Sequence, residues 1–196
     1  MAKRLPCLLV LACLVLPGRA LAEPSPDEQH SGVYLRMSVG VTSMQARYDA
    51  GTDSELGGSL SFALGYFILP NLALSLDVFG ANAYKFGVPD RPEETSIEFD
   101  ARSLALGASL TYYLPYDFYL SVAPGIGWLL VGIAGEESRF SNAGFALDTI
   151  AGKEWWIGGS WALGAGLQFI YLLADVPSAR VDYSWSLGVL FTVTRN

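Results

Sequence analysis

The feature that most limits how this chain can fold is a strict alternation of side-chain types that recurs along most of its length. In residues 33–41, every odd position is aliphatic or Met, while the even positions carry Gly, Tyr or a polar residue. Successive residues of a strand point to opposite faces of a sheet, whereas a helix would scatter this pattern around its surface. The sequence therefore predicts an all-β fold.

About eight strands are expected. Alternation is poorest in the sixth segment, whose bounds are the least defined. Short turns rich in Pro, Asn, Asp and Gly alternate with longer polar loops, which is typical of strands that run up and down in sequence order. The expected strands are residues 33–41, 59–68, 72–84, 103–112, 118–131, 144–155, 161–171 and 183–193. The expected turns are residues 70–71, 115–117 and 156–159, and the loops are residues 85–96, 132–143 and 175–180.

Three features favour a membrane over a soluble sandwich or a soluble ligand-binding barrel. One face of each strand is large and apolar over the 9–11 residues that a tilted strand needs to cross a bilayer. The opposite face is built from Gly, Ala, Ser and Thr, which fit a narrow closed interior. Aromatic residues gather near the strand ends, as in the interfacial girdles of membrane barrels. These residues are Tyr66, Tyr112, Tyr113, Tyr116, Phe118, Trp155, Trp156 and Trp161.

A sheet in lipid cannot leave an edge strand unpaired, because no water is available to its free N–H and C=O groups. The first and last strands must therefore pair, and we expect a closed up-and-down antiparallel transmembrane β-barrel over residues 23–196. An even strand count returns both termini to the periplasmic side, with the short turns on that side and the longer loops outside.

Residues 1–22 are predicted to be a secretory signal peptide. Lys3 and Arg4 precede an apolar run from Leu5 to Leu16, and Ala20-Leu21-Ala22 is a small-residue cleavage site. The run of about 12 residues is shorter than the ~20 that a spanning helix needs. Both cysteines lie in this segment, and lipid attachment there is the less favoured alternative because apolar residues follow Cys13. Cleavage near Ala22 leaves a protein without disulfide or thiol chemistry.

The charge balance argues against nucleic acid as a partner. Loss of the signal segment leaves nine basic and nineteen acidic residues, a net charge of about −10. A chain this acidic, without a basic stripe, repels phosphate backbones.

The sequence offers no catalytic or cofactor-binding constellation. The only histidine is His30, which precedes the first expected strand, so no strand carries an imidazole that could act as a base. The glycines lack the spacing of a phosphate-binding loop, and no Cys or His cluster is suited to zinc. We therefore expect no enzyme, no cofactor and no metal site. A lipid-modifying enzyme would need a mechanism without histidine.

Charged residues on the small-residue faces are the candidate functional residues. Arg36, Asp77, Glu154 and Asp182 would point into the barrel, where a buried charge needs a partner. We expect salt bridges that plug the interior, because eight strands enclose a space that side chains can fill. The alternative is that these charges line a path for ions or small solutes.

The expected outer loops are acidic. A solvated surface is the simplest interpretation, and divalent cations that bridge the acids to lipopolysaccharide phosphates are the more specific hypothesis. The residues are Asp49, Asp53, Glu55, Asp90, Glu93, Glu94, Glu98, Asp100, Glu136 and Glu137.

The signal segment, eight strands and short turns resemble the small outer-membrane barrels typified by outer-membrane protein X and the OmpA transmembrane domain. Ser186, Gly188, Phe191 and Val193 are similar to the C-terminal signal read by the barrel assembly machinery, although three further residues follow Val193. The resemblance implies an integral outer-membrane protein in contact with lipid and lipopolysaccharide. It implies a non-enzymatic role in envelope integrity or surface interaction, with a narrow channel for small or hydrophobic solutes as the alternative. Neither the resemblance nor the residues identify a surface ligand.

Overall fold

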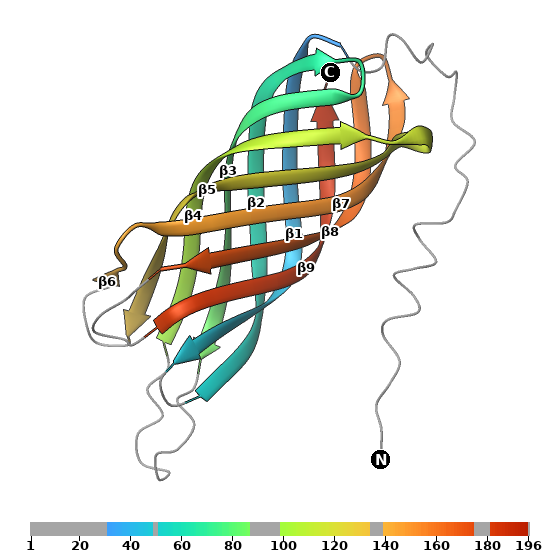
Figure 1. Ribbon diagram of the computed structural model, residues 1–196. Coiled ribbons are helices and arrows are strands. Elements are labelled where there is room, and N and C mark those ends of the chain that lie inside the picture. Colours follow the sequence, from blue (N-terminus) through green and yellow to red (C-terminus); the bar gives the residue numbers. More distant parts are fainter. Residues whose placement is uncertain (1–30, 49–50, 87–98, 134–138, 175–180, 196) are drawn as a thin grey trace, which may run out of the picture.

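The computed structural model describes residues 31–48, 51–86, 99–133, 139–174 and 181–195. Within these ranges it contains nine strands and one short 3₁₀ turn, η1 (Figure 1). No helix in this part of the chain is long and apolar enough to cross a membrane. The elements are β1 (Val33–Tyr48), β2 (Gly51–Leu69), β3 (Leu72–Phe86), β4 (Phe99–Tyr113), η1 (Pro115–Asp117), β5 (Phe118–Ile133), β6 (Arg139–Phe140), β7 (Gly144–Gly158), β8 (Trp161–Leu173) and β9 (Val181–Arg195).

Eight of these strands form a closed antiparallel ring, which confirms the predicted barrel. Each strand pairs with its neighbour in sequence, and β1 pairs with β9 to close the ring. β6 is an added two-residue strand. It pairs with the end of β5 where the pairing of β5 with β7 stops at Gly127 and Gly144. The expected loop over residues 132–143 therefore includes the end of β5 and all of β6.

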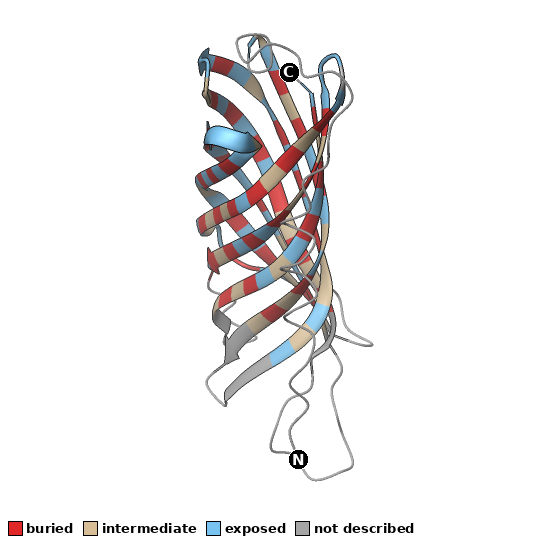
Figure 2. Cartoon of the chain, turned by 90° about the vertical axis from the view of Figure 1, so that its right-hand side faces the viewer, coloured by how far each residue is buried: buried red, intermediate tan, exposed pale blue. Residues whose placement is uncertain are grey.

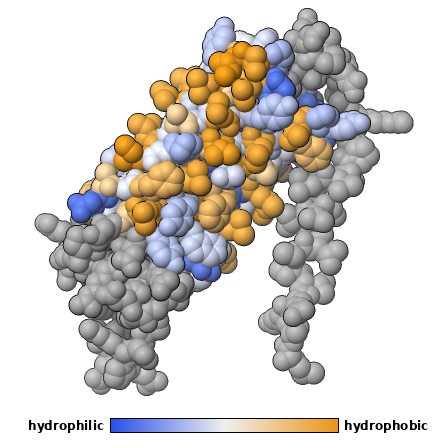
Figure 3. Space-filling model, viewed as in Figure 1, coloured by the Kyte–Doolittle hydropathy of each residue, from blue (hydrophilic) through white to orange (hydrophobic). Residues whose placement is uncertain are grey.

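The barrel faces are those that the alternation predicts (Figure 2). On β1, Val33, Met37, Val39 and Val41 are exposed, while Tyr34, Arg36 and Ser38 are buried. The same parity holds on the other long strands, so large apolar residues cover the outer surface (Figure 3). This distribution is the reverse of a soluble protein, and it suits a wall that is surrounded by lipid.

The strands extend further than predicted at the end of the long loops. β1 and β2 pair as far as Tyr48 and Gly51, although alternation is clear only to residue 41. Nearly all of the extra pairs include a polar residue, and one of them joins Gln45 to Ser54. Alternation records contact with lipid, so it fades where the strands leave the bilayer while backbone pairing continues.

The short turns lie at the opposite end of the barrel. Pro70 and Asn71 join β2 to β3, and η1 joins β4 to β5. In η1, Tyr116 and Asp117 have positive φ angles of 66° and 61°, a conformation that Asp tolerates better than most residues. Gly159 and Ser160 form the third turn, so the turn expected near residues 156–159 begins later than predicted.

The predicted aromatic girdle is correct for most of its members. Tyr66, Tyr112, Tyr116, Phe118 and Trp161 are exposed on the outer surface. Two other members point inward instead, and Tyr113 and Trp156 are only 4% and 8% exposed. Each lies an odd number of residues away from the outward-facing residues of its own strand. Because side chains alternate between the two faces of a strand, both point into the barrel.

Candidate functional site

The barrel interior is where the structure gathers polar and charged side chains. It is organised in layers along the barrel axis. An aromatic cluster lies toward the short turns, and an apolar cluster lies toward the long loops. The apolar cluster contains Met44, Phe79, Leu129, Val131, Ile170 and Leu172, together with seven alanines.

 The aromatic cluster contains Tyr34, Phe67, Tyr113 and Tyr119, together with Ala63, Ala73, Ile150 and Leu190.

The aromatic cluster closes the interior near the short turns. The ring of Phe67 meets that of Tyr34 edge-on at 5.5 Å between centroids, and it lies 5.9 Å from the ring of Tyr113. Tyr113 and Tyr119 are also 5.9 Å apart. Such tilted and edge-on pairs add a stabilisation of about 0.5–1.5 kcal/mol to that of the buried area.

Arg36 lies among these tyrosines. Its guanidinium carbon is 5.1 Å from the ring centroid of Tyr119 and 5.7 Å from that of Tyr34, within the range of a cation–π contact. Its Nη2 donates a hydrogen bond of 2.8 Å to Ser121 Oγ on β5. The side chain is 1% exposed, so bulk water does not solvate its charge.

Glu154 of β7 is fully buried and accepts two hydrogen bonds. Tyr113 Oη donates to its Oε2 at 3.1 Å, and Thr194 Oγ1 donates to its Oε1 at 2.6 Å. The two donors come from β4 and β9, neither of which neighbours β7 in the ring. Glu154 therefore joins three strands that the backbone ladder does not connect directly.

Asp77 and Asp148 are also buried, at 1% exposure each. The amide nitrogen of Gln168 donates to both carboxylate oxygens of Asp148 at 3.1 Å. Neither carboxylate oxygen of Asp77 has a hydrogen-bond partner among the described residues, and the same holds for Nε and Nη1 of Arg36.

The structure thus places three of the four predicted interior charges, Arg36, Asp77 and Glu154, inside the barrel. Within the described part of the chain, Arg36 contacts a hydroxyl group and aromatic rings, and Glu154 contacts two hydroxyl groups. No ion pair shorter than 4.0 Å joins Arg36 to a carboxylate there. Asp182 belongs to β9, but its side chain lies outside the described residues.

Sequence reasoning missed Asp148 and its partner Gln168. Asp148 has the same parity as Glu154 on β7, so the register that placed Glu154 inside would also have placed Asp148 there. On the outward-facing row of this strand, Thr149 and Ala151 interrupt the large apolar residues, so the alternation is hard to recognise in the sequence. Gln168 lies among small and apolar inward-facing residues on β8, and its polar amide was the only sequence feature that could have marked it as an interior hydrogen-bonding residue.

The four residues of the resembled assembly signal lie on β9. Ser186 is buried on the inner side, and Phe191 is exposed on the outer side. Gly188 and Val193 are half-buried. Their role in assembly stays a prediction, as do the signal peptide and its cleavage near Ala22, which lie outside the described residues together with His30. Within the described residues, no group of three or more His, Cys, Asp or Glu side chains could hold a metal ion.

Among the solved structures that are similar to this chain, Neisserial surface protein A shows the same fold. Neisserial surface protein A has a TM-score of 0.54 and 17% identity, over 84% of this chain and 97% of that one. The attachment invasion locus protein Ail of Yersinia pestis, solved with the heparin analogue sucrose octasulfate, has a TM-score of 0.46 and 14% identity, over 82% and 99%. OprG of Pseudomonas aeruginosa has a TM-score of 0.45 and 12% identity, over 85% and 98%.

No curated protein matches the sequence. A family model described as an outer membrane protein beta-barrel domain, however, matches residues 8–191, which is nearly the whole chain. This match agrees with the closed ring, the apolar outer face and the small, polar inner face. The chain therefore belongs to the family of outer-membrane β-barrel proteins.

Proposed function

We propose that this protein is a non-enzymatic outer-membrane barrel that contributes to envelope integrity or to surface interactions through its acidic loops, and that it does not conduct solutes. The observation that carries the proposal is the filled interior. Aromatic and apolar clusters occupy its two ends, and Arg36, Asp77 and Glu154 are buried between or beside them. Eight strands enclose a space just wide enough for side chains, so such an interior leaves little room for a solute.

The sequence supports the non-enzymatic part of the proposal. Hydrolytic sites in proteins commonly pair a nucleophile or a carboxylate with an imidazole base. The single histidine, His30, precedes the barrel in the sequence. The buried hydroxyls of Ser121 and Thr194 contact Arg36 and Glu154, and no strand carries a histidine that could activate them.

The surface role rests on the acidic loops. Most of their acids lie outside the described residues, and among the described side chains Glu55 and Asp100 are half-buried near the loop end of the barrel. In an outer membrane, these acids would meet the phosphates of lipopolysaccharide. Divalent cations between the two negative groups would turn repulsion into attraction.

Planar-bilayer recording tests the proposal against a narrow channel. The folded mature protein is expected to give no conductance steps, whereas a large porin added to the same membrane gives them. Reproducible steps from folded protein that are absent with heat-denatured protein would overturn the non-conducting part. In that case, an altered reversal potential in Arg36→Gln would place the ion path in the interior.

Cells that lack the protein provide the physiological test. We expect their outer membrane to admit more of a hydrophobic dye or a large antibiotic than that of wild-type cells, and expression of the wild-type chain should restore the barrier. Unchanged uptake and unchanged adhesion to host or abiotic surfaces would contradict an envelope or surface role.

A further inference from the structure

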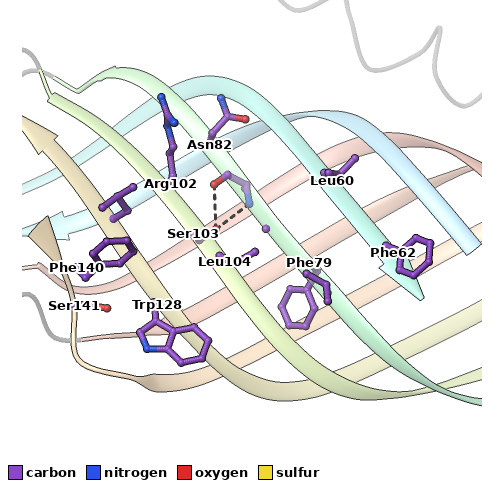
Figure 4. A pocket seen from close by; sticks show the side chains of 14 residues that line it. Leu60, Phe62, Phe79, Asn82, Arg102, Ser103, Leu104, Trp128, Phe140 and Ser141 are labelled. Atoms are coloured by element: carbon purple, nitrogen blue, oxygen red, sulfur yellow. Dashed lines mark hydrogen bonds between the residues drawn. The ribbon is translucent and has the colours of Figure 1, made fainter. Parts of the chain in front are cut away.

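A groove on the outer wall of the barrel is not explained by the proposed function. It has a volume of about 930 Å³, within the range of roughly 300–1,000 Å³ that is typical of sites for small organic ligands. It crosses β2, β3, β4 and β5 in the half of the barrel nearer the long loops (Figure 4). Its apolar lining includes Leu60, Phe62, Val78, Leu104, Trp128 and Phe140.

The groove has a local cause in the wall. Gly80 lies on the outward-facing row of β3, opposite Leu60 of β2 and next to Leu104 of β4. With only a hydrogen atom at this position, the row of apolar side chains has a gap. A Cβ at Gly80 would clash with the carbonyl oxygen of Ser103, so the backbone geometry keeps the gap open.

The pairing of β3 with β4 is also interrupted here. Backbone pairs join Phe79 to Ala105 and Asn82 to Arg102, but none joins the residues between them. The Ser103 hydroxyl fills the interruption (Figure 4): its Oγ accepts from Ala81 N at 2.9 Å and donates to Ala81 O at 3.2 Å. The wall is therefore closed at this point, and the groove opens toward the lipid.

Two polar side chains stand at the end of the groove nearer the long loops. Arg102 and Asn82 are cross-strand partners on the outward-facing rows of β4 and β3. Arg102 is exposed, and within the described part of the chain it has no ion pair or hydrogen bond. Asp100 is the nearest acid on the same row of β4, two residues away and half-buried.

The position of Arg102 sets the depth of this end. On β4, the outward-facing residues from Leu104 to Tyr112 form the apolar stretch, and Arg102 is the first residue beyond it. An arginine on the lipid face costs about 2–4 kcal/mol at the bilayer midplane but about 0–1 kcal/mol near the interface. Arg102 therefore lies at the level of the lipid headgroups, where phosphate is the complementary anion.

We propose that this groove holds one phosphorylated, acylated lipid of the outer leaflet, with an acyl chain along Leu60, Leu104 and Trp128 and a headgroup phosphate on Arg102. The acyl chain makes the apolar contacts that the absent side chain at Gly80 leaves unmade. The guanidinium and the Asn82 amide supply donors to the phosphate oxygens. Lipid A of lipopolysaccharide is the lipid with this chemistry that the outer leaflet of a Gram-negative outer membrane supplies.

Native mass spectrometry of the folded mature protein tests the proposal. Detergent micelles that contain the protein are titrated with diphosphoryl lipid A, and the fraction of protein that retains one lipid is measured. We expect one retained copy. Arg102→Gln should weaken retention roughly tenfold, the effect of losing one charge-assisted contact. Val78→Trp should weaken it by placing an indole in the groove.

Matched variants separate this site from general lipid contact. Arg195→Gln removes an exposed arginine at the opposite end of the barrel, where it lies over Trp161. Val189→Trp adds the same indole on β9, at a valine that is 42% exposed compared with 43% for Val78. Neither control should alter retention. A shift in gel mobility on heating shows that each variant is a folded barrel.

The outcomes decide between the sources of binding. Equal retention by Arg102→Gln and wild type, or equal losses in test and control variants, would overturn the proposal. Retention of lipid A without phosphates equal to that of diphosphoryl lipid A would overturn the role of Arg102 in phosphate binding. Displacement of the lipid by inorganic phosphate, without any dependence on the acyl groups, would overturn the role of the groove in holding an acyl chain. None of these results depends on whether the protein conducts solutes or maintains the envelope.

Discussion

Replacement of Glu154 is the most direct test of how the barrel interior is held together. Its two carboxylate oxygens accept hydrogen bonds from Tyr113 and Thr194, and the side chain has no exposed surface. Glu154→Ala removes both acceptors and leaves a cavity. Each buried donor that loses its acceptor costs about 1–3 kcal/mol, and these costs are not fully additive. We expect the free energy of unfolding to fall by about 2–4 kcal/mol.

Glu154→Gln separates hydrogen bonding from volume. The Gln side chain fills the same space, and its oxygen can accept one of the two hydrogen bonds. Its amide nitrogen can donate to the Thr194 hydroxyl if that hydroxyl rotates, because a hydroxyl both donates and accepts. The expected loss for Gln is about 1 kcal/mol, clearly smaller than that for Ala. Thr149→Ala is the control on the same strand, since Thr149 is half-buried on the outward-facing row.

The assay is a urea titration of the mature protein in lipid vesicles. Tryptophan fluorescence and gel mobility follow unfolding and refolding, because the free energy is defined only if the two directions coincide. The control should remain within about 0.5 kcal/mol of wild type. Two results would refute the reasoning: an Ala variant as stable as wild type, or a Gln variant that loses as much as the Ala variant.

Two further predictions concern packing and the loops. Gly152→Val should destabilise the barrel by about 1–3 kcal/mol in the same titration, because a Cβ at Gly152 would lie 2.7 Å from the Tyr119 ring and hydroxyl. The control is Ala151→Val at the adjacent outward-facing position, which should be nearly neutral. Equal effects of the two substitutions would contradict the packing argument. Chelation of divalent cations should make the acidic loops more sensitive to protease in membranes that contain lipopolysaccharide while the barrel stays folded, and unchanged sensitivity would count against cation bridges.

The faces of the barrel were predictable because lipid imposes a simple demand on every outward-facing residue. A strand that crosses the bilayer must present an apolar side chain at every second position, and Val39 or Leu106 satisfies this rule without reference to any other strand. Arg36, Asp77 and Glu154 could be placed inside for the same reason, since each occupies the opposite parity. The rule fails where the bilayer ends, and the extra pairs of β1 with β2 were therefore missed.

The contacts of the interior and the outer groove could not be predicted, because they depend on register between strands. The hydrogen bond from Tyr113 to Glu154 joins residues 41 positions apart. Whether Glu154 meets a hydroxyl or a positive charge depends on which side chains the strand register brings together inside the barrel. The groove likewise needs Gly80 to lie beside Ser103 at an interrupted ladder. A glycine in a strand indicates a bulge or a close approach, but the sequence does not say to which neighbour.

The interior contacts matter because they do what the backbone ladder cannot. The ladder joins each strand only to its two neighbours, so a ring of eight strands resists opening but can flatten. Arg36 reaches from β1 to Ser121 on β5, and Glu154 on β7 is held from β4 and β9. The bond of Arg36 crosses the barrel, and each bond of Glu154 spans one intervening strand. Together they fix the cross-section, in a space just wide enough for side chains to fill. Weakening them should therefore loosen the barrel as a whole, which is why Glu154 carries a larger expected loss than its exposed neighbours.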